Sequence, residues 1–179
     1  AELGRSGGMI SRAILFFGLV LASGSSVAGQ HNPSADRSSQ LLQVRSDLTL
    51  AGDIDLAGIA DQHPQGVLYI DLRTPDEDGV IEDRDEALRL GMRYENIPVD
   101  GAQILAIQVA QLDAVLDRRG DFTHTVLRCG SGNRAGMMWG ATRIDAGEKP
   151  DQVMTQLQTI VTKPAAEQAL RDYAEISHR

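Results

Sequence analysis

The stretch "VLRCGSGNRAG" (residues 126–136) places the only cysteine of the chain, Cys129, at the end of an apolar, β-prone run. A glycine-rich turn follows it, and Arg134 comes five positions after the cysteine. A turn that leads from a strand into a helix directs backbone N–H groups at one point, and the helix dipole adds positive charge there. The pattern therefore predicts an anion-binding loop that favours the thiolate form of its cysteine.

The predicted loop assigns one role to each kind of residue. Cys129 supplies the nucleophile, and Arg134 supplies a guanidinium that can hold an anion with two hydrogen bonds. The predicted anion-binding residues around them are Gly130, Ser131, Gly132, Asn133, Ala135 and Gly136. The alternative is purely structural, with Cys129 as a small buried side chain and Arg134 on the surface. The order strand, cysteine, glycine, arginine, helix favours the reactive interpretation.

Outward from this loop, apolar runs typical of strands alternate with segments of helical periodicity. The predicted strands are 48–52, 67–72, 92–99 and 123–129. The predicted helices are 53–63, with Asp53 as a possible N-cap, 81–90, 102–119, 134–146, 151–162 and 165–176. This alternation predicts an α/β fold of three layers, in which helices flank a mostly parallel central sheet. In such sheets ligands bind beyond the carboxyl ends of the strands, which is where Cys129 falls.

The amino-terminal region predicts export. Residues 1–28 are interpreted as a non-native start ahead of Met9 followed by a secretory signal, because Arg12 precedes an apolar run (13–22) that is too short to span a bilayer and small residues follow it. The alternative is a retained membrane anchor. Residues 29–46 are polar and predict a flexible leader, so that the domain comprises residues 47–179. The expected location is therefore secreted or periplasmic, without stable membrane insertion.

Composition limits the partners of this domain. The chain has 179 residues with 42% hydrophobic content, which is enough for one core. Its formal net charge of −8 and the absence of a Lys/Arg block argue against a nucleic-acid partner. One cysteine and no histidine pair at ligand spacing predict no metal site, and no glycine pattern for a nucleotide follows any strand, so no cofactor is expected. The sequence leaves the oligomeric state open.

Four segments together resemble a known family: "LTLAGDIDLAGIAD", "GVLYIDLR", "GMRYENIPVD" and "HTVLRCGSGNRAG", within residues 47–146. They are similar to the cysteine-dependent protein tyrosine and dual-specificity phosphatase superfamily, and most of all to the beta-lactamase-hydrolase-like phosphatase domain family. The resemblance implies that Cys129 attacks phosphorus to form a cysteinyl-phosphate, while Arg134 holds the phosphoryl oxygens. It also implies a general acid at Asp100, which follows the strand predicted at 92–99. Asp100 could equally be the N-cap of the next helix.

The spacing inside the loop departs from the superfamily. Four residues separate Cys129 from Arg134, where those phosphatases have five. The shorter spacing is similar to rhodanese-type sulfurtransferases, whose thiolate accepts a sulfane sulfur as a persulfide. The favoured function is a phosphatase-like hydrolase acting on a small anionic substrate or a phosphorylated protein. The alternatives are sulfur transfer and an inactive anion-binding module. Arg73 and Glu77 are expected to pair or to support the loop.

Overall fold

The structure, a computed structural model, describes residues 40–177. The predicted non-native start and secretory signal (1–28) lie outside these residues, as does most of the predicted leader (29–46). None of the helices within residues 40–177 combines the length and the apolar composition that crossing a membrane requires.

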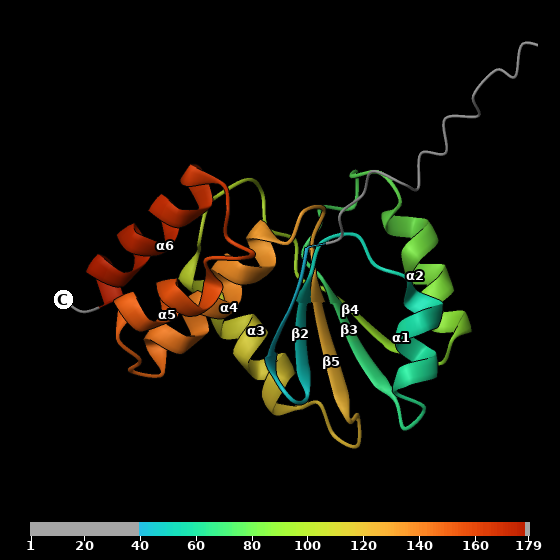
Figure 1. Ribbon diagram of the computed structural model, residues 1–179. Helices are drawn as coiled ribbons and strands as arrows, with labels where there is room; N and C mark the ends of the chain where they lie inside the picture. The colour runs from blue at the N-terminus through green and yellow to red at the C-terminus, as the bar shows by residue number, and fades with distance from the viewer. Residues whose placement is uncertain (1–39, 178–179) are drawn as a thin grey trace, which may run out of the picture. The chain divides into compact units, whose positions relative to one another are not determined.

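A five-stranded sheet forms the centre of the described chain (Figure 1). The strands are β1 (Leu41–Arg45), β2 (Leu48–Ala51), β3 (Val67–Asp71), β4 (Arg93–Asn96) and β5 (His124–Arg128). Their spatial order is β1-β2-β5-β3-β4. β1 pairs antiparallel with β2, and the other three pairings are parallel. The mostly parallel sheet predicted from the sequence is confirmed.

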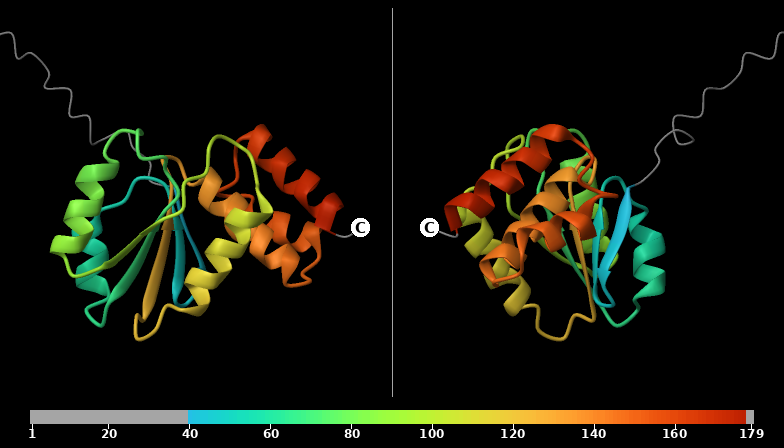
Figure 2. Two further views of the ribbon diagram at one scale, coloured as in Figure 1. Left: turned by 180° about the vertical axis from the view of Figure 1, so that it is seen from behind. Right: turned by 60° about the vertical axis from the view of Figure 1, so that its left-hand side comes forward.

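Helices cover both faces of this sheet (Figure 2). The helices of the described residues are α1 (Leu56–Gln62), α2 (Val80–Arg89), α3 (Ala106–Asp117), α4 (Asn133–Asp145), α5 (Pro150–Leu157) and α6 (Pro164–Ser177). α1 and α2 lie on one face, while α3 and α4 lie on the other, where α5 and α6 pack against α4. The three-layer arrangement is therefore confirmed as well.

The strands bury both of their faces, which explains their nearly continuous apolar sequences. In β3, Leu68 and Ile70 belong to the larger core beneath α3–α6, whereas Val67 and Tyr69 belong to the smaller core beneath α1 and α2. Successive side chains of a strand point to opposite faces, so this alternation fixes which residues face which layer. Leu127 of β5 faces the larger core too, and this brings the loop after β5 to the side of α4.

Several boundaries differ from the sequence predictions: the helix predicted at 151–162 ends at Leu157, and the strand predicted at 92–99 ends at Asn96. Residues 41–45, assigned to the flexible leader, form β1, because their pairing with β2 and the packing of Leu42 and Val44 on the core outweigh polar neighbours. α1 is capped by Asp55, whose side chain accepts a hydrogen bond from the Ala57 N–H at 3.1 Å, and not by Asp53. α3 begins only at Ala106, so residues 102–105 remain in the loop after β4.

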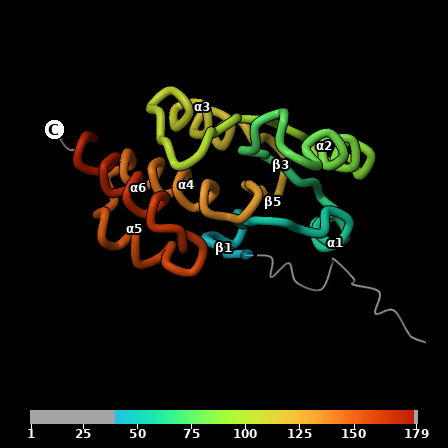
Figure 3. The backbone as a smooth tube through the Cα atoms, turned by 90° about the horizontal axis from the view of Figure 1, so that it is seen from above, coloured from blue at the N-terminus to red at the C-terminus, as the bar shows by residue number. Residues whose placement is uncertain are grey.

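The parallel strands end at one edge of the sheet. Figure 3 looks down on this edge and shows β5 passing into α4, with α1 and α2 toward one side. The segments that follow β3, β4 and β5 therefore meet above the same edge, and they contain Glu77, Asp100 and Cys129 respectively. This is the position at which ligands bind in open α/β sheets.

Candidate active site

The loop after β5 folds around its cysteine. Cys129 is buried, with 1% of its surface exposed, and its sulfur accepts a hydrogen bond from the Gly132 N–H at 3.1 Å. Gly132 has a φ of 84° and directly precedes α4. A Cβ at this position would lie 2.8 Å from Cγ1 of Ile160, closer than real Cβ contacts allow. Both the positive φ and the lack of space for a Cβ therefore require glycine at position 132, whose N–H donates the hydrogen bond to the Cys129 sulfur.

A second glycine, Gly52, lies in close contact with the backbone of the loop. A Cβ on Gly52, which follows β2, would lie 3.0 Å from the backbone carbon of Ser131. The loop thus rests against the end of a neighbouring strand. Cys129 also donates its backbone N–H to the Ala51 carbonyl at 3.1 Å, so the loop continues the pairing of β5 with β2.

Arg134 is fixed beside the cysteine by a carboxylate. Its Nη1 and Nη2 donate to Oε1 and Oε2 of Glu77, each at 2.6 Å, and Nη1 also donates to the Val99 carbonyl at 2.8 Å. The bond to Glu77 raises the pKa of Arg134, and the Cys129 sulfur raises it further. In turn, the hydrogen bond from Arg134 lowers the pKa of Glu77 to about 2. Glu77 therefore supports the loop arginine, as expected from the sequence.

Arg73, the other residue of that expectation, lies in a separate network and does not pair with Glu77. Its Nη2 donates to Asp71 and to Asp83, both at 2.7 Å, and Asp83 also pairs with Arg128 of β5. Asp71, Arg73 and Arg128 are all at most 5% exposed. The network joins the ends of β3 and β5, and Arg73, Asp83 and Arg128 also line a hollow beside the loop.

Asp100 shares a cavity with the loop. A hollow of about 620 Å³ is lined by Asp100, Gly130, Ser131 and Arg134, together with residues of the segment after β3 and the start of α6. Asp100 itself is exposed. It does not cap α3, because the N-cap of that helix is Leu105. The alternative role of Asp100 as the N-cap of the next helix is therefore wrong, and the residue lines the same hollow as Arg134.

The remaining loop residues divide into two groups. Ser131 is half-buried and lines the hollow, and its Oγ accepts a hydrogen bond from Nδ2 of Asn133 at 3.4 Å. Ala135 and Gly136 are buried inside α4, and a Cβ on Gly136 would lie 2.6 Å from Cγ2 of Val161. Ala135 and Gly136 are not among the lining residues of the hollow, so they serve the packing of α4.

One residue that lines the site, Lys163, was not predicted from the sequence. Lys163 lines the hollow from the turn between α5 and α6, although it lies far along the chain from Cys129. Asn133 was predicted as an anion-binding loop residue, and in the structure its Oδ1 accepts the backbone N–H groups of Thr162 and Lys163, both at 2.8 Å. The sequence around Asn133 could not predict this contact, because the start of α4 and the turn before α6 are distant in sequence and meet only in the folded chain.

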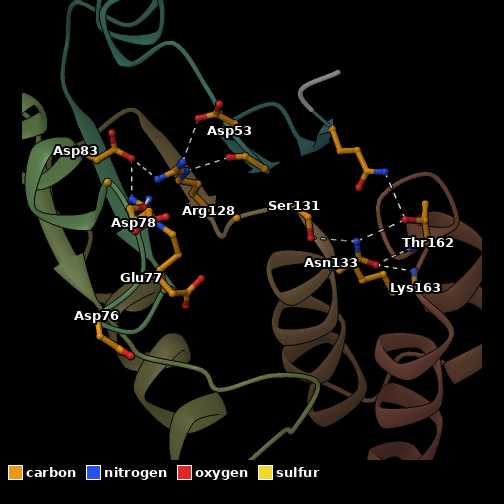
Figure 4. A pocket seen from close by; sticks show the side chains of 15 residues that line it. Asp53, Asp76, Glu77, Asp78, Asp83, Arg128, Ser131, Asn133, Thr162 and Lys163 are labelled. Atoms are coloured by element: carbon orange, nitrogen blue, oxygen red, sulfur yellow. Dashed lines mark hydrogen bonds and ion pairs between the residues drawn. The ribbon is translucent and has the colours of Figure 1, made fainter. Parts of the chain in front are cut away.

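A larger hollow of about 1030 Å³ continues past the loop and shares Glu77, Ser131 and Lys163 with the first. Figure 4 shows its carboxylates on one side, with Asp76 and Glu77, and Thr162 and Lys163 on the other, across the loop at Ser131. No group of three or more His, Cys, Asp or Glu side chains within residues 40–177 is arranged to hold a metal ion.

Comparison by sequence finds no protein-family model and no curated protein that match the chain. Comparison of structures finds many similar folds. A DUF442 protein from Shewanella putrefaciens CN-32 with a provisional phosphatase assignment is 19% identical, with a TM-score of 0.58, over 77% of this chain and 88% of that one. A protein from Neisseria meningitidis Z2491 with a similar assignment is 16% identical, with a TM-score of 0.60, over 75% and 98%.

A third similar structure is the core catalytic domain of the PP-IP phosphatase Siw14 from S. cerevisiae, in complex with citrate. It is 12% identical, with a TM-score of 0.61, over 76% of this chain and 84% of that domain. At such identities the likeness establishes the shared fold. None of these three descriptions mentions beta-lactamase-hydrolase-like proteins, so that closer resemblance stays a prediction.

Proposed function

We propose that this chain, which has the fold of the cysteine-dependent protein tyrosine phosphatases, hydrolyses phosphomonoesters through a cysteinyl-phosphate. One observation carries the proposal. Cys129 is buried beneath the loop and its sulfur accepts a hydrogen bond from the Gly132 N–H, while Arg134 beside it lines a hollow that Asp100 also lines. A nucleophile, an anion-binding guanidinium and a carboxyl group that can carry a proton thus follow neighbouring strands at one edge of the sheet.

The first step of the proposed reaction transfers the phosphoryl group to sulfur. The thiolate of Cys129 attacks phosphorus, an S–P bond forms, and the bond from phosphorus to the leaving oxygen breaks. Asp100 gives its proton to that oxygen, which leaves as an alcohol or phenol. Arg134 binds the non-bridging oxygens, and it is held charged and in place for this by Glu77.

The second step releases phosphate. Water attacks phosphorus and gives a proton to the Asp100 carboxylate, while the S–P bond breaks and the thiolate of Cys129 returns. The hydrogen bond from the Gly132 N–H stabilises negative charge on the departing sulfur. No cofactor is needed for this sequence of steps.

The short loop favours sulfur transfer as the second candidate. With only Gly130, Ser131, Gly132 and Asn133 between Cys129 and Arg134, fewer residues surround the anion than in the five-residue loops. In that reaction the thiolate takes the outer sulfur of thiosulfate, the S–S bond breaks, and sulfite leaves. A thiol or cyanide then removes the sulfur from the persulfide. An inactive anion-binding module is the third candidate, and it forms neither adduct.

Intact-mass spectrometry distinguishes the three candidates. The protein is incubated briefly with an aryl phosphate and quenched in acid, and a second sample is incubated with thiosulfate. A phosphoryl adduct that the Cys129→Ser variant lacks supports the phosphatase. An added sulfur atom with no phosphoryl adduct supports the sulfurtransferase, and no adduct in either sample, together with no phosphate release, supports the module.

We also propose that the protein is exported and that its substrate is a small phosphorylated molecule or a phosphorylated protein. The apolar run at 13–22 supports export, and the hollow of about 620 Å³ has room for a leaving group beyond the phosphoryl group. Cell fractionation with amino-terminal sequencing of the mature protein tests export. A cytoplasmic protein that retains residues 1–28 contradicts it.

A further inference from the structure

Lysine is rare in this chain, and one of its two lysines lines the site. Lys149 and Lys163 are the only lysines, and each directly precedes a proline. Pro150 begins α5 and Pro164 begins α6, so the two lysines occupy equivalent local positions at helix starts. Only Lys163 lines the hollow above the loop, and it lines the adjoining larger hollow as well.

The backbone at Lys163 is tied to the anion-binding loop. Asn133, 4% exposed at the start of α4, accepts the N–H groups of Thr162 and Lys163 on a single oxygen, at 2.8 Å each. Its Nδ2 donates to Ser131 Oγ at 3.4 Å and to Thr162 Oγ1 at 3.5 Å. Because one buried side chain holds both segments, the base of the Lys163 side chain has a fixed position relative to the loop.

Lys163 differs from the other cations of the two hollows in having no carboxylate partner. Arg134 pairs with Glu77, while Arg73 and Arg128 both pair with Asp83. No ion pair among residues 40–177 includes Lys163. A positive charge at a helix start is also unfavourable to the helix, since the amino-terminal end of the helix dipole is itself positive. Neither ion pairing nor helix stability accounts for a lysine at this position.

We propose that Lys163 binds a second anionic group of the substrate, a carboxylate or a second phosphate on the leaving group. This inference rests on the proposed phosphatase function and names the class of substrate. Arg134 and the loop hold the phosphoryl group that reacts, and the flexible side chain of Lys163 reaches the second group from the α6 side of the hollow. Lys163 is in this way a specificity-determining residue of the site.

The charges around the hollow select the direction in which such a substrate lies. Asp76 lines the hollow from the segment after β3, on the side opposite Lys163 (Figure 4), and Asp100 lines it from the segment after β4. A second anion directed toward Asp76 meets like charge, whereas one directed toward α6 meets Lys163. The substrate therefore lies with its leaving group toward the turn between α5 and α6.

Kinetics with matched aryl phosphates test the inference. Four substrates are used: phenyl phosphate, meta-carboxyphenyl phosphate, its neutral isostere meta-carbamoylphenyl phosphate, and meta-phenylene bisphosphate. For each protein, the KM of the charged substrate is divided by the KM of the neutral isostere. Removal of the charge in Lys163→Gln is expected to raise this ratio by about three- to ten-fold, with Lys163→Arg restoring most of it. Lys149→Gln, the matched control at the other Lys-Pro helix start, is expected to keep the ratio of the wild type.

The outcomes separate this inference from the function on which it rests. If the aryl phosphates are hydrolysed and the ratio is the same in wild type and Lys163→Gln, the inference is wrong and the phosphatase stands. The carboxylate and bisphosphate substrates show which of the two anions Lys163 prefers. If no aryl phosphate is hydrolysed, the proposed function is wrong, and binding of the matching phosphonates to Cys129→Ser decides the inference. Tighter binding of the charged phosphonate that depends on Lys163 then supports it, and equal binding overturns it.

Discussion

Arg134 and Glu77 are joined by two parallel hydrogen bonds of 2.6 Å, one from each terminal nitrogen of the guanidinium to each oxygen of the carboxylate. Glu77 is further held by the Thr74 N–H, which donates to its Oε1 at 2.8 Å. The segment after β3 therefore sets the direction of the arginine in the loop after β5. Two segments that are distant in sequence thus determine one element of the site together.

This pair predicts a specific acid sensitivity. The pKa of Glu77 is lowered from 4.5 to about 2 in the folded protein, first by the bond from Arg134. Between pH 4.5 and pH 2 the Glu77 carboxyl is protonated in the unfolded chain but still ionised in the folded protein. The Arg134–Glu77 pair therefore stabilises the folded protein fully above about pH 4.5, and this stabilisation is lost as the pH falls through 2. Glu77→Gln should lower the free energy of unfolding at pH 7 by about 1 kcal/mol, after allowance for solvent screening.

Urea midpoints measured from pH 7 downward check this prediction. The difference between wild type and Glu77→Gln should narrow as the pH falls below 4.5. Glu86→Gln is the control, because Glu86 pairs with Arg89 on the exposed surface of α2. A difference for Glu77→Gln that stays constant with pH contradicts the assignment.

Asp100 should matter most when the leaving group is poor. Asp100→Asn cannot donate a proton, so kcat with an alkyl phosphate is expected to fall by about 10²- to 10⁴-fold. With para-nitrophenyl phosphate, whose leaving oxygen needs no proton, the fall should be much smaller. Asp76→Asn removes a charge from the same hollow and is the control. Equal losses for both substrates in Asp100→Asn exclude the general-acid role.

Asn133→Ala should loosen the turn that carries Lys163. The substitution leaves the N–H groups of Thr162 and Lys163 without the acceptor that they share. The expected cost is about 1–3 kcal/mol in the free energy of unfolding, measured by urea denaturation. The preference for substrates with a second anion should fall in parallel. If Asn133→Ala has the stability of the wild type, the hydrogen bonds from Thr162 and Lys163 to Asn133 do not stabilise the fold.

Gly132→Ala should destabilise the protein more than an alanine at another glycine of similar conformation. Gly91 has a φ of 75°, and a Cβ added there would meet no atom within 4 Å, whereas Gly132 combines a φ of 84° with the contact to Ile160. Gly91→Ala is expected to cost about 1 kcal/mol for the left-handed conformation alone. Gly132→Ala has the same cost and, in addition, the steric clash between its Cβ and Ile160, so its melting temperature should be the lower of the two. Thermal denaturation of both variants measures this difference. Equal melting temperatures contradict the prediction.

His124 predicts a second pH dependence near neutrality. Burial, followed by the stacked ring of His63 at 3.7 Å, lowers the pKa of His124 below its ordinary value of 6.5. The unfolded chain takes up the proton first as the pH falls, so stability is present above pH 6.5 and decreases below it. His124→Phe should lack this decrease in urea denaturation between pH 7.5 and 5. A steeper decrease in the variant contradicts the assignment.

The fold was predictable because its signals are local. The buried strands β3 and β5 are continuous apolar runs, and Pro150 and Pro164 mark the starts of α5 and α6 as the sequence indicated. β1 was missed because its exposed residues are mostly polar, and only Leu42 and Val44 alternate toward the core. An edge strand with one buried face carries too weak a pattern to stand out from a leader.

The site was predictable as far as it is contiguous in sequence. Cys129 and Arg134 come from one loop, and the strand–loop–helix order places them without any tertiary information. The pairing of Arg134 with Glu77 was anticipated only as support for the loop, and the contribution of Lys163 was missed. Both depend on which segments lie beside α4, and neither the hydrophobic pattern nor the spacing of residues specifies that.

The contact of α4 with the two last helices also determines where the chain can be shortened. The sequence segments that resemble known phosphatases lie within residues 47–146, which makes a fragment that ends at residue 146 an obvious choice for expression. Such a fragment would leave Gly136 and Gly140 of α4 facing water where Val161, Leu157 and Leu170 now pack. An expressed unit for crystallisation or for transfer of the site must therefore extend through α6, and one that ends at residue 146 would expose apolar surface and aggregate.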